Sequence, residues 1–88
     1  MLNQKEKEKI VEKFKTHPTD TGSPEIQAAL LSEEMKQLAS HLKAHPKDFY
    51  SKRGLLKMVA KRRTVLSYLK REDETRHKAL IKKLDIRQ

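Results

Sequence analysis

The sequence predicts an all-α protein with four helices, in which the last three form the core and the N-terminal helix is mobile. Apolar residues recur at spacings of three and four, which places them on one face of a helix. The 88 residues include two glycines and three prolines, which leaves little room for tight hairpins between strands. Apolar residues make up 35% of the chain and aromatic residues 5%, so the core has to be thin and mostly aliphatic. A chain of this length predicts one domain, covering residues 1–88.

The first predicted helix covers about residues 3–16. Ile10, Val11 and Phe14 form a short apolar stripe on it. Pro18 is expected to end the helix, because the residue before a proline is disfavoured in the α conformation. Three apolar anchors hold a helix weakly, so we expect this helix to be the most mobile element.

The second predicted helix begins with a Ser-Pro-Glu segment. Ser23 is a good N-cap, proline suits the first helical position, and glutamate complements the positive end of the helix dipole. The helix is expected to stop before Pro46. Its apolar face is predicted to consist of Ile26, Leu30, Leu31, Met35, Leu38 and Leu42.

The third predicted helix runs from an N-cap at Asp48 to about Arg71 and packs antiparallel to the second, because the loop between them is short. Gly54 is unfavourable in a helix by about 1 kcal/mol relative to alanine, and we interpret it as a point of close approach, including the approach of a ligand backbone. The apolar side is predicted to be Leu55, Leu56, Val59, Leu66 and Leu69, flanked by Met58 and Val65.

The fourth predicted helix runs from Glu74 to Leu84. Asp73 is its expected N-cap. Leu80 and Ile81 are expected to face inward together with the leucine that ends the helix. This helix completes the predicted core of three helices.

Positive charge is concentrated in the C-terminal part of the chain. The formal net charge is +9, and residues 52–88 carry thirteen Lys and Arg against four acidic residues. Such a distribution is typical of proteins that bind a phosphate backbone. On the third predicted helix a cationic stripe falls in one sector opposite the apolar side, made of Lys57, Lys61, Thr64, Tyr68 and Arg71.

Two interpretations of this stripe compete. A solvated surface face would look similar, but the stripe lacks the interspersed glutamates that would pair with its cations along the helix. Tyr68 could stack on a base or sugar, or it could cover the edge of the core. The charge asymmetry favours binding of nucleic acid.

The join between the second and third predicted helices brings His41, Asp48 and Ser51 close together, which suits recognition of a shape in nucleic acid. The spacing of His41 and His45 is also compatible with a metal site, and a His-Asp-Ser trio is compatible with a hydrolytic site. No further His or Cys completes a metal site, and no nucleophile elbow or glycine-rich phosphate loop accompanies the trio. We therefore expect a protein that is not an enzyme and has no cofactor and no metal.

A second polar segment, DTGS at residues 20–23, precedes the second predicted helix. Its residues favour an ordinary turn and helix cap. They also expose backbone and hydroxyl donors at a helix N-terminus, where an anion or an RNA backbone can bind, and Gln27 lies one turn further on. The spacing alone favours the ordinary turn.

The chain has no cysteine, no apolar run near the roughly 18 residues of a membrane span, and no apolar segment of the signal-peptide type. We therefore expect a cytoplasmic protein without membrane contact. Its broad apolar faces are those that pack the helices together, so we expect it to be monomeric when free.

Over its whole length the chain resembles the bacterial-type S-fifteen family of small-subunit ribosomal proteins. The resemblance rests on short segments in the family's order and spacing, whose joint occurrence is highly specific. They are DTGSPEIQ at 20–27, HLK at 41–43, KD at 47–48, SKRGLL at 51–56, KRR at 61–63, YL at 68–69 and LI at 80–81.

This resemblance implies a structural protein of the small ribosomal subunit that binds small-subunit ribosomal RNA and helps to assemble the subunit. The RNA contacts implied are a three-way junction and an adjacent minor groove. Other small-subunit proteins are implied as partners, and a contact to the large subunit is left open. The matching residues are Thr21, Gly22, Gln27 and Tyr68 for the minor groove, His41, Asp48 and Ser51 for the junction, and Arg53, Arg63 and Arg71 as basic positions.

The chain departs from the family's usual residues at several positions. Lys52 stands where arginine is frequent, Pro46 replaces a common lysine and Thr64 a frequent basic residue. A Phe-Tyr pair at 49–50 replaces a polar pair that is often rich in histidine, and Asp85 begins an altered C-terminal segment.

Two other functions stay open from the residues alone. One is a helical module that binds an acidic protein partner. The other is a DNA-binding helix-turn-helix, although the two central helices are long for that motif.

Overall fold

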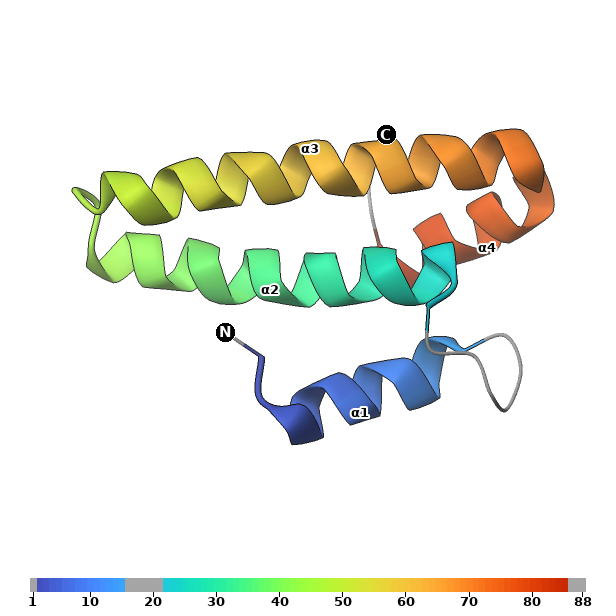
Figure 1. Cartoon of the computed structure of the whole chain (residues 1–88), viewed down its shortest axis with the longest axis horizontal. Coiled ribbons are helices and arrows are strands. Elements are labelled where there is room, and N and C mark those ends of the chain that lie inside the picture. The colour runs from blue at the N-terminus through green and yellow to red at the C-terminus, as the bar shows by residue number, and fades with distance from the viewer. Residues whose placement is uncertain (1, 16–21, 86–88) are drawn as a thin grey trace.

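Four α-helices make up most of the residues that the structure, a computed structural model, describes, which are 2–15 and 22–85. They are α1 (Gln4–Phe14), α2 (Pro24–Ala44), α3 (Phe49–Glu72) and α4 (Glu74–Leu84). Figure 1 shows α2 and α3 side by side and antiparallel, with α4 folded back under the C-terminal end of α3 and α1 on the opposite side of α2. The predicted all-α fold is confirmed. None of the helices in the described ranges is long and apolar enough to cross a membrane.

Side-chain caps determine where the four helices begin. The caps are Asn3, Ser23, Asp48 and Asp73, and each accepts a hydrogen bond of 2.8–3.3 Å from the backbone N–H three residues further on. Each bond satisfies an N–H that the first helical turn leaves without an intrahelical partner. The three caps predicted for α2, α3 and α4 are confirmed, and α2 ends at Ala44, before Pro46, as predicted.

Helix α1 is shorter than the predicted range of residues 3–16. Asn3 lies outside the helix as its cap, and Lys15 already has an extended backbone with φ −61° and ψ 146°. The Lys15 N–H still donates to Val11 O at 2.8 Å, so the chain leaves the helix directly after one last bond. The predicted terminator, Pro18, lies outside the described residues.

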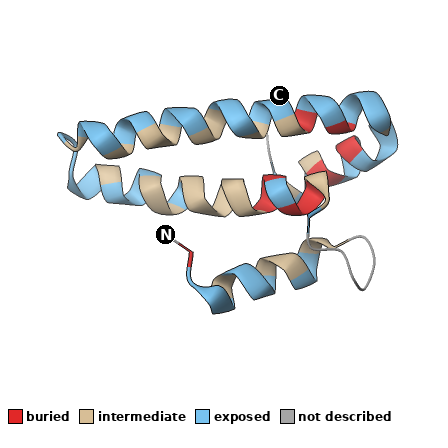
Figure 2. Cartoon of the chain, in the orientation of Figure 1, coloured by how far each residue is buried: buried red, intermediate tan, exposed pale blue. Residues whose placement is uncertain are grey.

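The core lies at one end of the α2–α3 hairpin, where α4 adds a third helix (Figure 2). Ala28, Leu66, Leu69 and Leu80 form a buried cluster there. Ile26, in the first turn of α2, is also fully buried. Burial of a leucine side chain such as that of Leu69 contributes about 1.5–3 kcal/mol, so a few such residues hold the three helices together.

At the other end, away from the start of α4, the apolar face of the hairpin is half-buried. Leu38 and Leu42 of α2 and Leu55 and Val59 of α3 are all of intermediate exposure. The prediction that Leu56 shares this face is wrong, since its side chain is 65% exposed. One residue along a helix turns the side chain by about 100°, which carries Leu56 away from α2.

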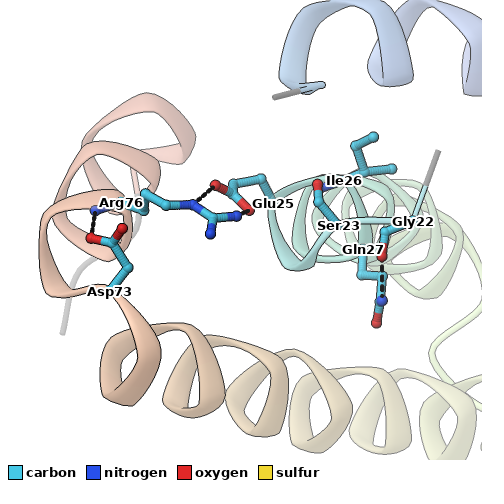
Figure 3. A network of polar contacts seen from close by, with 7 residues as sticks. All are labelled: Gly22, Ser23, Glu25, Ile26, Gln27, Asp73 and Arg76. Atoms are coloured by element: carbon cyan, nitrogen blue, oxygen red, sulfur yellow. Dashed lines mark hydrogen bonds and ion pairs between the residues drawn. The ribbon is translucent and has the colours of Figure 1, made fainter. Parts of the chain in front are cut away.

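A bidentate ion pair joins the start of α2 to the start of α4. The Arg76 guanidinium donates from Nε to Glu25 Oε2 at 2.7 Å and from Nη2 to Glu25 Oε1 at 2.6 Å (Figure 3). Glu25 is only 8% exposed, and the pair satisfies both of its carboxylate oxygens. Two parallel N–H···O bonds fix both distance and orientation, so this contact sets the position of α4 against α2.

Helix α1 contains no buried residue and is attached by a few contacts. Gln37 Nε2 of α2 donates to Glu6 Oε2 at 2.6 Å. Lys83 Nζ of α4 donates to Lys13 O at 2.6 Å and lies 4.6 Å from the centre of the Phe14 ring. The expectation that three apolar residues alone anchor α1 is therefore wrong, because these polar contacts and the buried Leu2 side chain add to them.

Candidate nucleic-acid interface

The turn of the α2–α3 hairpin brings His41, Asp48 and Ser51 together around one carboxylate. Ser51 donates to Asp48 twice, from its hydroxyl to Oδ2 at 2.7 Å and from its backbone N–H to Oδ1 at 3.0 Å. His41 Nε2 lies 2.7 Å from Asp48 Oδ2 and donates when it carries the ring proton. The last turn of α2, the loop and the first turn of α3 thus hold one polar group, which we call the hairpin-turn cluster.

The pKa of Asp48 lies well below its usual value of 3.8. The largest cause is the hydrogen bond from the Ser51 hydroxyl, followed by the one from the Ser51 N–H and the one from His41. Each donor stabilises the charged carboxylate more than the neutral acid. At neutral pH Asp48 is therefore ionised and can only accept hydrogen bonds. About a third of its side chain remains exposed, so an incoming hydroxyl or amine can reach it.

A cavity of about 550 Å³ opens beside this cluster. Its walls are the last turn of α2 and the loop, from His41 and Ala44 to Lys47 and Asp48. The His41 ring lies 4.8 Å from the ring of His45, measured between their centres and tilted by 36°. Within the described ranges no group of three or more His, Cys, Asp or Glu side chains is arranged to hold a metal ion.

At the opposite end of the hairpin, the start of α2 presents a second set of polar groups. Gln27 Nε2 donates to Gly22 O at 2.9 Å, and this bond fixes the amide across the helix N-terminus (Figure 3). Gly22 and Gln27 are both exposed, and Ser23 caps the helix between them. Thr21, predicted to belong to this set, lies outside the described residues.

The two sets lie at opposite ends of α2. Fourteen residues separate Gln27 from His41, which corresponds to about 21 Å along the helix axis. Because α3 runs antiparallel, Tyr68 near its C-terminal end is at the same end of the hairpin as Gln27. A ligand that contacts both sets therefore has to be extended.

Helix α3 carries the predicted cationic stripe on its exposed side. The predicted residues, all of them exposed on the side opposite the buried Leu66 and Leu69, are Lys57, Lys61, Thr64, Tyr68 and Arg71. Arg53 is also exposed and extends the stripe by one turn, because it lies four residues before Lys57. Arg63 is also exposed, but two residues turn a helix by about 200°, so it lies outside the stripe that contains Lys61. Arg62 points inward instead and donates from Nη1 to Ser32 Oγ on α2 at 3.0 Å.

Tyr50 is a further candidate for this interface that was not identified from the sequence. Its side chain is 88% exposed, in the first turn of α3. Eighteen residues separate it from Tyr68, which is five full turns, so both tyrosines lie on the side of the cationic stripe. The spacing of eighteen residues between the two tyrosines, compared with the positions of the cations, could have identified Tyr50 from the sequence.

These features describe a small, basic, all-α protein with polar sets at both ends of a helical hairpin and cations between them. Residues 7–87 match the family model described as Ribosomal protein S15, so the chain belongs to this family. Proteins named small ribosomal subunit protein uS15 from Caldanaerobacter subterraneus and Carboxydothermus hydrogenoformans are each 54% identical to it. The first match covers 99% of both chains, and the second covers 98% of this chain and 97% of the relative. The relative from Oceanobacillus iheyensis is also 54% identical, over 98% of this chain.

Proposed function

We propose that this protein is a structural constituent of the small ribosomal subunit that binds small-subunit ribosomal RNA at a three-way junction and an adjacent minor groove. The observation that carries the proposal is the position of Asp48. An ionised carboxylate adds no affinity for phosphate, yet here it is held in place on the exposed turn of a protein with a net charge of +9. Such a group suits the sugar hydroxyls and base amines that a junction crowds together.

The set at the start of α2 suits a minor groove. In A-form RNA this groove is shallow and presents 2′-hydroxyls and base edges. The backbone of Gly22 and the side chain of Gln27 are short polar groups on an exposed surface. The bond between them holds the Gln27 amide in one orientation before RNA arrives. Tyr68 at the same end offers a ring and a hydroxyl to a sugar or base.

The cationic stripe supplies affinity through phosphates. It runs along α3 between the two polar sets, and its cations are exposed. Lys and Arg that neutralise phosphates release counterions, so binding through the stripe weakens steeply as salt rises.

The relatives support this proposal, because they carry the name of a small-subunit ribosomal protein and match nearly the whole chain. The role that follows is assembly and structure of the subunit in the cytoplasm, with its RNA and its other proteins as partners. Catalysis has no part in it.

Binding titrations with three partners test the proposal. The chain is titrated with a three-way-junction RNA of the small-subunit type, a plain RNA duplex of equal length and an acidic protein, each at several salt concentrations. We expect the junction to bind at least about tenfold more tightly than the duplex, with affinities that fall as salt rises. Equal affinity for junction and duplex, or tighter binding of the acidic protein, would contradict it.

A further inference from the structure

A cavity of about 410 Å³ lies between the first turns of α3 and the facing side of α2. Its floor is apolar and consists of Leu38, Gly54 and Met58, and Tyr50 forms one wall. Arg53 and Lys57 of the cationic stripe are at its rim, and no acidic residue lines it. The chemistry of the cavity is therefore that of an apolar slot with cations beside it.

Tyr50 presents its ring to solvent at the edge of this cavity. It is 88% exposed, against 47% for Tyr68 on the same side of α3. Rings in such positions are platforms on which nucleic-acid bases stack, because every base has a π face. The position of Tyr50 beside an open apolar floor makes it a suitable platform.

Gly54 keeps the floor of the cavity open. A Cβ added to it would meet only Leu38 Cδ2, at 3.8 Å, which is an ordinary contact. The packing of α2 against α3 therefore does not require glycine, although glycine is less favourable than alanine in a helix. Within the described residues no neighbour of Gly54 requires glycine, and the close approach of a ligand backbone at Gly54 stays a prediction.

The cavity adjoins the hairpin-turn cluster through Ser51. Ser51 lines the cavity and at the same time donates its hydroxyl to Asp48 at 2.7 Å. RNA held at the cluster would pass the mouth of the cavity with its phosphates near Arg53 and Lys57. A nucleotide links a flat apolar base to an anionic phosphate through a short tether, which matches a slot with a cationic rim.

We propose that this cavity binds one unstacked nucleobase, which lies on the Tyr50 ring over Gly54 while its flanking phosphates contact Arg53 and Lys57. The proposal rests on the proposed function, since it takes RNA at the hairpin-turn cluster as the source of the base. It adds a subsite for an unpaired nucleotide to the junction contacts of the cluster.

Tyrosine fluorescence tests the subsite directly. The chain has two tyrosines and no tryptophan, so the difference in fluorescence between the wild type and Tyr50→Phe reports on Tyr50. Both proteins are titrated with two three-way-junction RNAs, one with a single unpaired nucleotide labelled as 2-aminopurine and one fully paired. We expect the first RNA to quench Tyr50 and the protein to quench 2-aminopurine, with little change for the fully paired RNA.

Affinity measurements on otherwise wild-type protein complete the test. Tyr50→Ala should weaken binding to the RNA with the unpaired nucleotide by roughly five- to one-hundredfold, and Tyr50→Phe should bind like wild type. Phe49→Ala is the matched control, because it removes another exposed ring from the same turn that does not line the cavity. It should stay within about twofold.

Three results would overturn the subsite. The first is an Asp48-dependent preference for the junction together with unchanged binding by Tyr50→Ala and no quenching, which would leave the proposed function intact. The second is an equal loss of affinity in Tyr50→Ala and Phe49→Ala, and the third concerns self-association. A failure of the proposed function gives a different result, because the wild-type protein then binds the junction no more tightly than the duplex. Self-association lost in Tyr50→Ala would assign the cavity to a second copy of the chain and also overturn the proposal.

Discussion

At the scale of single residues, Asp48 has two roles that can be separated. Its Oδ1 caps α3 through the Ser51 N–H, and its Oδ2 is bonded to the Ser51 hydroxyl and to His41. The first role stabilises a helix, as Asp73 does for α4. The second role, through Oδ2, forms a polar surface with Ser51 and His41 that capping of the helix does not require.

The lowered pKa of Asp48 makes part of the protein's stability depend on pH. Below about pH 3.8 this carboxylate stays charged in the folded protein but binds a proton in the unfolded chain. Proton binding therefore favours the unfolded state as pH falls. We expect the stability advantage of wild type over Asp48→Asn to be constant above about pH 5 and to shrink below pH 4. Urea unfolding of both proteins between pH 2 and 7 measures this. An advantage that grows in acid would contradict the role of the three donors.

The ion pair of Arg76 with Glu25 should contribute measurably to stability. Arg76→Gln leaves a carboxylate that is only 8% exposed without its bidentate partner, so we expect a loss of about 1–3 kcal/mol in the free energy of unfolding. Lys78→Gln removes a cation from the same helix, 3.8 Å from the exposed Glu74, and should cost less than about 0.5 kcal/mol. Urea midpoints of the two variants give the comparison. Equal losses in the free energy of unfolding would contradict a larger contribution from the Arg76–Glu25 pair.

Residues whose role is local could be predicted from the sequence, and residues whose role depends on a distant partner could not. The caps Ser23, Asp48 and Asp73 follow from short-range hydrogen bonding, and the structure confirms them. Glu25 was expected only to complement a helix dipole, because its partner Arg76 is 51 residues away. The burial of His77 in α4 gave no signal in the sequence either.

At the scale of elements, α1 differs from the other helices in how it is attached. Helices α2, α3 and α4 share buried side chains, whereas α1 has none of its own. Among the described residues, it is held by a hydrogen bond to α2 and by the contacts of Lys83 at its C-terminal end, besides half-buried apolar residues. The element with fewest buried groups opens most easily.

We therefore expect α1 to open separately from the core. Amides in residues 8–14 should exchange with solvent at least about tenfold faster than those in residues 55–66, and Lys83→Met should speed exchange in α1 without affecting α3. Lys82→Met is the control, because Lys82 lies beside it in α4 and has no contact with α1 among the described residues. Hydrogen exchange followed by NMR measures both segments. Protection in α1 equal to that in α3 would contradict the separate opening.

Element bounds were predictable where a proline or a cap defines them. Helices α2 and α4 have the predicted bounds, and α3 ends one residue beyond Arg71. The end of α1 was not predictable, because Lys and Glu are good helix formers and gave no reason to stop at Phe14. Similarly, periodicity predicted the apolar sides of α2 and α3 but not that α4 covers only one end of them.

At the scale of the whole molecule, charge and polar groups are arranged along the long axis. The axis is 40 Å long, with the hairpin-turn cluster at one end, the Gly22 and Gln27 set towards the other and the cationic stripe between them. This arrangement suits an extended ligand that is recognised at two points and attracted along the path between them.

The stripe should act without regard to RNA shape. Lys57→Ala and Lys61→Ala should each weaken binding to junction and duplex RNA alike and reduce the slope of log K against log salt by about one. Lys9→Ala removes an exposed lysine from α1 instead and should leave the slope nearly unchanged. Titrations at four or more salt concentrations give the slopes. A loss confined to the junction would assign these lysines a role in shape recognition.

The sequence also predicted much of the candidate site, for a physical reason. A short loop between two long helices requires an antiparallel hairpin, which brings His41 to Asp48 and Ser51. Tyr50 was missed, although its spacing of eighteen residues from Tyr68 places it on the side of the cationic stripe. Helical periodicity gives the side of a helix on which a ring lies, but not how far the ring is exposed.

The most direct test of the account is the junction preference of Asp48→Ala. We expect this variant, once circular dichroism shows it folded, to bind the three-way junction roughly five- to one-hundredfold more weakly and the duplex as well as wild type or slightly better. Asp73→Ala is the matched control, because it removes the same kind of cap from α4 and should leave the ratio of the two affinities unchanged. A folded Asp48→Ala protein with the wild-type ratio would contradict the account and leave Asp48 only the role of a helix cap.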